Sequence, residues 1–402
     1  MISAEEFTTR HVSESDLEEL LEGVGTPAVS IYLPTHRPND QADADRIRFR
    51  SSLERTRELL AGRGDADRLA AELTDVEPLI RDTDFWRNQA DGFALFLAPG
   101  FRRAFRLSGD VPELTTVGDA FHLLPLIERL QDLNQYWVLE LGQERVRLWK
   151  GGAEGATRLN PEALPLDLRD ALEVEFERDV MMVLTRKERD GSHGDHGRGG
   201  VMPVFHGHGE RGPGREERLL RQYCRRLDDA LHQVLGEESR RPVILAAVDE
   251  NQAVYREASR TEMLAEEGIE ANVRYWSPEE VHEAAWPIVQ GQVQTTVDRA
   301  LEIWERAGGS GKTESDVANL SHLAAQGRLR LLMVEKGRWV WGRRDPDTGD
   351  VEFAREGGED PGPESVEILD ALARSVLQHG GTVLPLSGER MPVETGAAAV
   401  LW

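Results

Sequence analysis

Residues 194–214, GDHGRGGVMPVFHGHGERGPG, gather side chains that could do chemistry in a stretch crowded with glycine. Imidazole and carboxylate groups bind zinc, nickel or copper, and histidine also transfers protons near neutral pH. The candidate groups are His193, Asp195, His196, His206 and His208. Assembling a metal site from one glycine-rich loop would cost much chain entropy. We therefore expect no metal here and predict a polar loop over 189–214, with acid–base chemistry by His206 and His208 as an alternative.

An amphipathic helix is predicted directly after this loop. One of its faces is basic, with side chains at spacings of three and four: Arg215, Arg218, Gln222 and Arg225. The other is apolar: Leu220, Tyr223, Leu227, Leu231 and Val234. The basic face predicts contacts with RNA phosphates, and Arg198 and Arg211 extend it into the loop. The alternative is surface pairing of these arginines with Glu216, Glu217 and Asp228.

A second, smaller basic cluster lies in the first third of the chain. Arg102, Arg103 and Arg106 follow one another in the apolar run FRRAFRLSG, on a predicted hairpin. We expect this cluster to be a second, weaker RNA contact.

Composition bounds the class of protein. A chain of 402 residues with 39% hydrophobic content has room for two to four domains, each with its own core. No apolar run approaches the roughly 20 residues of a membrane helix, and the start MISAEEFTTR is not that of a signal peptide. We expect a cytoplasmic protein without membrane contact. The net charge of −25 disfavours nonspecific coating of nucleic acid and is also typical of a high-salt habitat.

No cofactor is expected. The segment GGSGKT at 308–313 resembles a phosphate-binding loop, but Arg306 stands where that motif needs its first glycine. The single cysteine, Cys224, lies in the amphipathic pattern and is expected to be a packed thiol. The sequence also lacks the Gly-x-Ser-x-Gly context of a serine nucleophile.

The elements that must position these groups fall into three predicted domains, 1–125, 126–276 and 277–402. The first is an α+β domain with helices at 13–22, 42–61 and 65–81. The second has a hairpin from YWVLEL to RVRLWKGG and a buried strand at 243–248, so helices should cover its sheet. The third is an α/β sandwich with helices at 314–326 and 364–379 and a hairpin through 343–349.

Several short motifs occur together and in one order: VSIYLPTHR, DGFALFLAPG, FHLLPL, FHGHG, PVILAAVD and GAAAVLW. In this combination the chain resembles the bacterial branch of the archaeo-eukaryotic release factor family, which includes class-one release factors and Pelota. The resemblance implies a multidomain α/β and α+β fold. Its central domain would be ribonuclease-H-like, with a protruding loop at 189–214. Its C-terminal domain would be similar to kink-turn-binding ribosomal proteins and would contact a protein partner.

In release factors of this family the protruding loop carries a Gly-Gly-Gln motif that assists peptidyl-tRNA hydrolysis. Gly199 and Gly200 match the two glycines, but Val201 stands at the glutamine position. Valine has no polar side chain to orient water, and its branched Cβ restricts the backbone. Peptidyl-tRNA hydrolysis by this loop is therefore in doubt.

The resemblance implies a protein that binds the ribosome, with ribosomal RNA and tRNA as partners. Residues 1–125 contain no recognisable stop-codon-reading motif. We therefore expect entry near the A site without codon reading, in ribosome rescue or hibernation. Two alternatives stay open: a hydrolase of peptidyl-tRNA or RNA that uses the histidine-rich loop, and a noncatalytic interaction module of stress metabolism.

Overall fold

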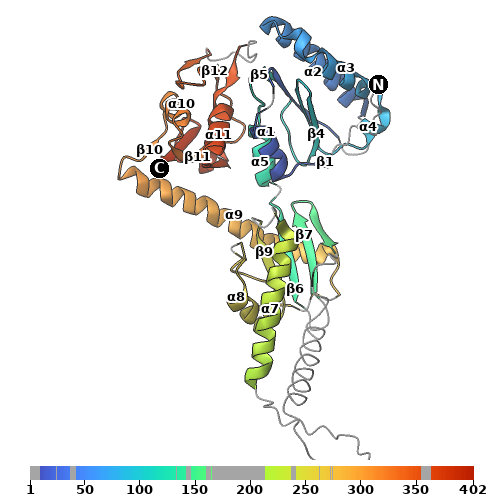
Figure 1. Cartoon of the computed structure of the whole chain (residues 1–402), viewed down its shortest axis with the longest axis vertical. Helices are drawn as coiled ribbons and strands as arrows, with labels where there is room; N and C mark the ends of the chain where they lie inside the picture. The colour runs from blue at the N-terminus through green and yellow to red at the C-terminus, as the bar shows by residue number, and fades with distance from the viewer. Residues whose placement is uncertain are drawn as a thin grey trace, which may run out of the picture. The chain divides into compact units, whose positions relative to one another are not determined.

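The structure is a computed structural model that describes residues 10–23, 25–36, 42–132, 134–141, 146–159, 164, 213–236, 241–261, 263–271, 273, 275–354 and 364–402. The chain divides into two compact units (Figure 1). Unit 1 combines Met1–Leu133 with Thr295–Trp402, and unit 2 is Asn134–Gln294. Each unit is described by itself below.

The N-terminal part of unit 1 is a five-stranded sheet covered by helices. Its strand order is β1 (Arg10–His11), β4 (Phe101–Leu107), β3 (Gly92–Ala98), β2 (Ala28–Pro34) and β5 (Leu114–Gly118). Only the β1–β4 pairing is parallel. Strands β2 and β3 are buried over almost their whole length, because apolar side chains on both faces meet packed elements.

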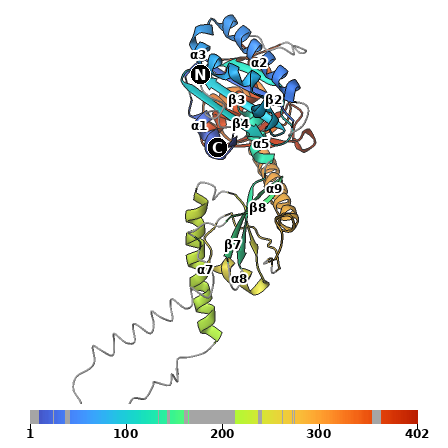
Figure 2. The same cartoon turned by 90° about the vertical axis from the view of Figure 1, so that its right-hand side faces the viewer.

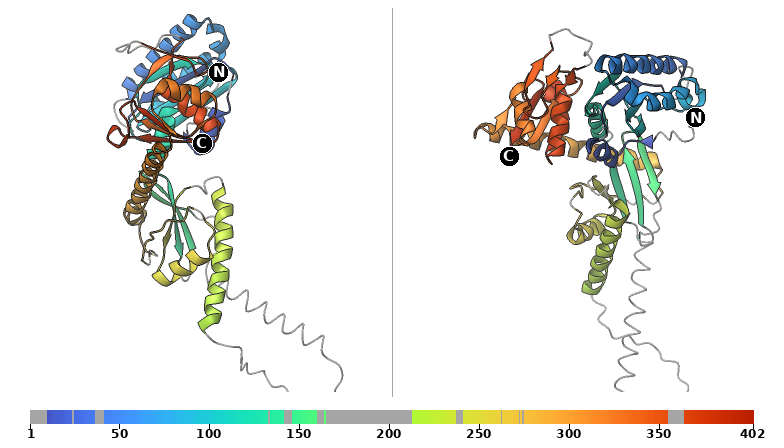
Figure 3. Two further views of the ribbon diagram at one scale, coloured as in Figure 1. Left: turned by 90° about the vertical axis from the view of Figure 1, so that its left-hand side faces the viewer. Right: turned by 45° about the horizontal axis from the view of Figure 1, so that its top comes forward.

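One face of this sheet packs under α2 (Ala42–Arg63), α3 (Ala70–Val76) and α4 (Thr83–Arg87), where Phe49, Trp86 and Phe93 form an aromatic cluster. The other face joins a second core with α1 (Glu14–Leu21), α5 (Leu124–Asp132) and apolar residues of the C-terminal segment. The red and orange C-terminal segment accordingly lies beside the blue-to-teal N-terminal segment in Figure 3.

The C-terminal part of unit 1 is a layered α/β arrangement. Its main sheet has the order β10 (Thr313–Glu314), β16 (Ala397–Leu401), β11 (Leu329–Glu335) and β15 (Thr382–Leu386). Helices α10 (Val317–Ala325) and α11 (Ile368–Gln378) contribute to one core, and the last turns of α9 (Pro278–Gly308) contribute to another. A small sheet has the order β13 (Val351–Phe353), β12 (Trp341–Arg344) and β14 (Val366–Glu367).

Unit 2 is built on one mixed sheet of order β8 (Gly155–Leu159), β7 (Val146–Gly152), β6 (Tyr136–Leu141) and β9 (Val243–Ala246). Strands β6 and β7 form the predicted hairpin, and β9 adds parallel to β6. One core lies under α7 (Pro213–Leu235) and α8 (Asp249–Ala258), and the other lies under the first half of α9 (Figure 2). The strand predicted at 243–248 ends at Ala246, two residues earlier than expected, and β9 is covered on both faces, as its apolar run indicated.

The mixed α/β class predicted from sequence is confirmed, and three helix predictions need correction. The helix expected at 65–81 is a 3₁₀ turn, α3 and a second 3₁₀ turn, and Pro78 opens that last turn. The helices predicted at 314–326 and 364–379 begin later, as α10 at Val317 and α11 at Ile368. The side chains of Asp316 and Glu367 cap these two helix starts. The division into three domains, with boundaries at 125/126 and 276/277, stays a prediction.

Candidate functional site

Helix α7 is the element that follows the glycine-rich loop, and its apolar face packs as predicted. Tyr223, Leu227 and Leu231 are buried in the same core as Trp137 and Leu245 of the sheet. Val234 is partly buried beside them. The 3.6-residue period of the sequence thus fixes which side of α7 faces the sheet.

The opposite face of α7 carries the predicted basic residues. Gln222 and Arg225 are exposed, and Arg225 has no ion pair within the described part of the chain. Its neighbour Arg221 pairs with Glu257 of α8 at 3.0 Å. Arg215 and Arg218 lie on α7, but their side chains are outside the description. Helical spacing places their Cα positions on the same face as Arg225.

Asp228 connects the middle of α7 by hydrogen bonds to α8 and to the segment that follows it. It is fully buried and accepts hydrogen bonds from Ser259 Oγ at 2.6 Å, Thr261 Oγ1 at 2.8 Å, Arg260 N at 2.9 Å and Tyr255 Oη at 3.1 Å. Burial disfavours its charge, but these hydrogen bonds outweigh that effect and hold the pKa of Asp228 below its ordinary value. Asp228 is thus no surface partner for the arginines of α7, contrary to the alternative raised from sequence.

Residues 189–212 of the predicted loop lie outside the described residues, whereas Pro213 and Gly214, predicted to end the loop, already belong to α7. The residues outside the description include Arg198, Gly199, Gly200, Val201, His206, His208 and Arg211. Their roles in RNA contact or catalysis stay predictions. Within the described residues, no three His, Cys, Asp or Glu side chains lie together as a metal ion would need.

The second predicted basic cluster lies on β4 and is largely paired with carboxylates. Arg102 forms an ion pair with Asp75, and Arg103 binds Glu19 with its Nε 3.0 Å from Oε2. The Arg103 guanidinium also lies over the Phe101 ring. These partners compensate two of the positive charges that the sequence pattern suggested for RNA, and a role for Arg102 and Arg103 in RNA binding stays a prediction.

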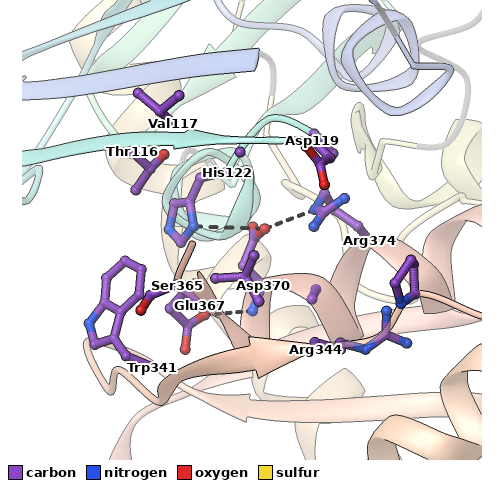
Figure 4. Close-up of a pocket in the computed structure, with 15 residues that line it drawn as sticks. Thr116, Val117, Asp119, His122, Trp341, Arg344, Ser365, Glu367, Asp370 and Arg374 are labelled. Atoms are coloured by element: carbon purple, nitrogen blue, oxygen red, sulfur yellow. Dashed lines mark hydrogen bonds and ion pairs between the residues drawn. The ribbon is translucent and has the colours of Figure 1, made fainter. Parts of the chain in front are cut away.

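A cavity of about 240 Å³ in unit 1 was not identified from sequence (Figure 4). Its walls come from β5 and the following turn, from β12, and from β14 with α11. Its chemically relevant side chains are Asp119, His122, Trp341, Arg344, Glu367, Asp370 and Arg374.

Asp370 lies at the centre of this cavity's hydrogen bonds. Its Oδ1 accepts from the backbone N–H groups of Leu123 at 2.6 Å and Leu124 at 2.8 Å. Its Oδ2 accepts from Arg374 Nε at 2.8 Å and lies 3.7 Å from His122 Nδ1. Figure 4 shows Asp370 between His122 and Arg374.

The buried groups differ in charge state. Burial opposes ionisation of Asp370, but the charge of Arg374 and the hydrogen bonds hold its pKa below the ordinary value. Burial lowers the pKa of His122, which favours the neutral imidazole near pH 7. Burial raises the pKa of Glu367 to about 8, against three hydrogen bonds from backbone N–H groups of Val340, Leu369 and Asp370.

Sequence signals for this cavity are weak. Its residues lie in two segments about 220 residues or more apart, and each segment reads locally as ordinary structure. The i, i+4 spacing of Asp370 and Arg374 indicates a helix-surface pair, yet Asp370 is only 3% exposed. Only the folded chain brings them to His122.

Residues 135–328 match the model of bacterial archaeo-eukaryotic release factor family 3, a range that includes β6, β9, α7 and the whole loop between them. Over these residues, slightly less than half of the chain, the sequence is similar to the bacterial branch of the archaeo-eukaryotic release factor family, the family that its motifs predicted. No protein of curated function matches the chain by sequence.

Three solved structures are among those that the chain matches. The archaeal translation termination factor aRF1 is 14% identical, covers 97% of this chain and 98% of its own, and has a TM-score of 0.24. Saccharomyces cerevisiae Dom34 is 10% identical over 77% of this chain and 72% of its own, with a TM-score of 0.37. Ribosome-bound archaeal Pelota is 10% identical over 98% and 95%, with a TM-score of 0.39.

No helix in the described part of the chain is long and apolar enough to cross a membrane.

Proposed function

We propose that this chain is a cytoplasmic, release-factor-like protein that binds the ribosome near the A site in rescue or hibernation, without reading a codon. The family match over 135–328 supports a role in translation. In this proposal α7 and the loop before it face ribosomal RNA or tRNA, and the C-terminal segment 277–402 contacts a protein partner.

The observation that carries the proposal is the two-sided character of α7. Its buried face fixes the helix on the sheet, so its polar face has one orientation, and Arg225 is exposed there without a carboxylate partner among the described residues. The chain as a whole has a net charge of −25, whereas Arg225 and the positions of Arg215 and Arg218 place positive charge together on one face of α7. Arginine suits phosphate because its planar fork donates two parallel hydrogen bonds.

Salt dependence tests this mode of binding. Three phosphate contacts would give a slope of log affinity against log salt of about −2 to −3. Pelleting of the purified chain with ribosomes across a potassium chloride series measures that slope. Affinity that does not change with salt would contradict a phosphate-binding face.

The loop's chemistry is a separate part of the proposal. Because Val201 provides no polar group, we expect no hydrolysis of peptidyl-tRNA by the Gly-Gly-Gln route. Ribosomes that carry peptidyl-tRNA, incubated with the chain, should release no peptide above the background rate. Release that disappears on changing His206 or His208 to alanine would establish the hydrolase alternative instead.

A further inference from the structure

The cavity in unit 1 holds two guanidinium groups whose hydrogen-bonding capacity is largely unused. Arg344 donates its Nε to Ser321 Oγ at 2.8 Å, and its Nη2 lies 3.5 Å from the Ser321 carbonyl oxygen. Arg374 donates its Nε to Asp370, and its terminal nitrogens have no partner among the described residues. A guanidinium has five N–H donors, so both arginines keep donors for a ligand.

The three acidic side chains that line the cavity either have cationic partners or are protonated. Asp370 is compensated by Arg374 and by two backbone N–H groups. Asp119 at the rim pairs with Arg63 at 2.5 Å, and Glu367 is mostly protonated below its pKa of about 8. Burial and the charge of Arg374 lower the pKa of Arg344 and outweigh the opposite effect of the neighbouring Asp345, so the two cations repel each other across the site. An anion bound between them would relieve this repulsion.

Two further features of the wall indicate the kind of anion. His122 is 5% exposed, and its Nε2 has no hydrogen-bond partner within the described residues. Trp341 provides an aromatic wall, with its ring 6.2 Å from that of Trp339 at an interplanar angle of 9°. An aromatic wall beside two arginines suits a phosphate carried on a planar organic group.

We propose that this cavity binds a phosphate ester of nucleotide size, with the phosphoryl group at Arg344 and Arg374 and the base toward Trp341. His122 supplies a further polar contact to the phosphoryl group. The ligand is either a free nucleotide or the phosphorylated end of an RNA chain. This inference does not depend on ribosome binding.

Calorimetric titration of the full chain, without ribosomes, tests the site. The probes are inorganic phosphate, AMP, adenosine and a short 5′-phosphorylated oligoribonucleotide. AMP should bind, and adenosine should bind at least tenfold more weakly. Tighter binding of the oligonucleotide than of AMP would assign an RNA end, and the reverse order would assign a free nucleotide. Absence of binding by phosphate, AMP and oligonucleotide alike would overturn the proposal.

Two substitutions and one control locate the binding. Arg344→Gln should weaken AMP binding at least tenfold. Arg343→Gln is the matched control. Arg343 is the neighbour of Arg344 on β12, but its side chain is 65% exposed and pairs with Glu364. Asp119→Asn removes a carboxylate at the rim, and since that side chain is 80% exposed the variant should fold and bind AMP a few-fold more tightly. Unchanged affinity in Arg344→Gln, or weaker affinity in Asp119→Asn, would contradict the assignment.

Discussion

Asp228 accepts four hydrogen bonds in a buried part of unit 2. Asp228→Ala would leave Tyr255, Ser259, Thr261 and the Arg260 N–H without their acceptor in a buried place. We expect a loss of about 2–4 kcal/mol in the free energy of unfolding. Urea unfolding measures it. Asp229→Ala is the control, because that exposed residue forms a surface ion pair with Arg260 and should change stability by less than about 0.5 kcal/mol. Equal effects of the two substitutions would contradict this role.

The same carboxylate predicts an acid dependence. The pKa of Asp228 is lower in the folded chain than its ordinary value, so its stabilisation is complete above the unfolded pKa of about 3.9. That stabilisation is lost as the pH falls through the folded pKa. The free energy of unfolding of unit 2 should therefore decline below about pH 4, and less steeply in Asp228→Asn. Identical acid profiles for both proteins, followed by circular dichroism, would show that Asp228 does not contribute.

The sequence predicted the burial of residues that follow from the helical repeat. It did not predict the environment of residues whose hydrogen-bond partners lie far away in the sequence. The burial of Tyr223, Leu227 and Leu231 follows from helical spacing alone. Asp228 looked like a surface partner for arginine, because its four donors lie 27 to 33 residues further along the chain. Asp370 is a stronger case, since its donors at Leu123 and Leu124 are 247 and 246 residues away.

At the scale of elements, the β6–β7 hairpin depends on a glycine. Gly151 lies directly opposite Tyr136, and a Cβ built there would be 2.1 Å from Tyr136 Cζ. Tyr136 is fully buried and its hydroxyl lies 2.8 Å from His282 Nδ1, so its ring has no free space to move into.

We expect Gly151→Ala to lower the free energy of unfolding by about 1–3 kcal/mol through this overlap. Gly291→Ala is a matched substitution in α9 of the same unit, where an added Cβ meets nothing within 4 Å. It should be neutral or stabilising by up to about 1 kcal/mol, because alanine favours the helix. Thermal unfolding compares the two. A stable Gly151→Ala protein would mean that the hairpin tolerates a shifted ring.

Elements with strong local signals were predictable, and their ends were less so. The hairpins at β3–β4, β6–β7 and β12–β13 follow from alternating or apolar runs around turn residues. The helix predicted at 65–81 is interrupted where Pro78 lacks the N–H that a continuous α-helix needs. The full length of α9 was not predicted. Pro287 is a residue that usually ends or kinks a helix, but α9 continues through it.

At the scale of the whole molecule, the two ends of the chain share one hydrophobic core. Phe96, Phe105 and Leu126 belong to the same buried cluster as Leu332 and Leu372. Neither segment of unit 1 completes that core alone, because each leaves apolar surface exposed.

Separate expression of the two segments tests this shared core. Fragments 1–133 and 295–402 should co-purify when expressed together, and each alone should aggregate or unfold without cooperativity. Fragment 134–294 is the control, because it contains its own sheet and two cores. A cooperative thermal transition of fragment 1–133 by itself would contradict the shared core.

Ribosome binding through α7 is the central claim, and charge reversal on that helix tests it most directly. In sucrose gradients of cell extract under starvation, the unaltered chain should sediment with ribosomes. Arg225→Glu, alone and combined with Arg215→Glu and Arg218→Glu, should move it to the soluble fractions, with affinity for purified ribosomes reduced at least tenfold in the triple variant. Arg158→Glu is the control, because Arg158 is an exposed residue on β8 of the same unit and its substitution makes the same charge change as Arg225→Glu. This variant should still sediment with the ribosomes. Co-sedimentation of the triple variant at the level of the unaltered chain would contradict the claim.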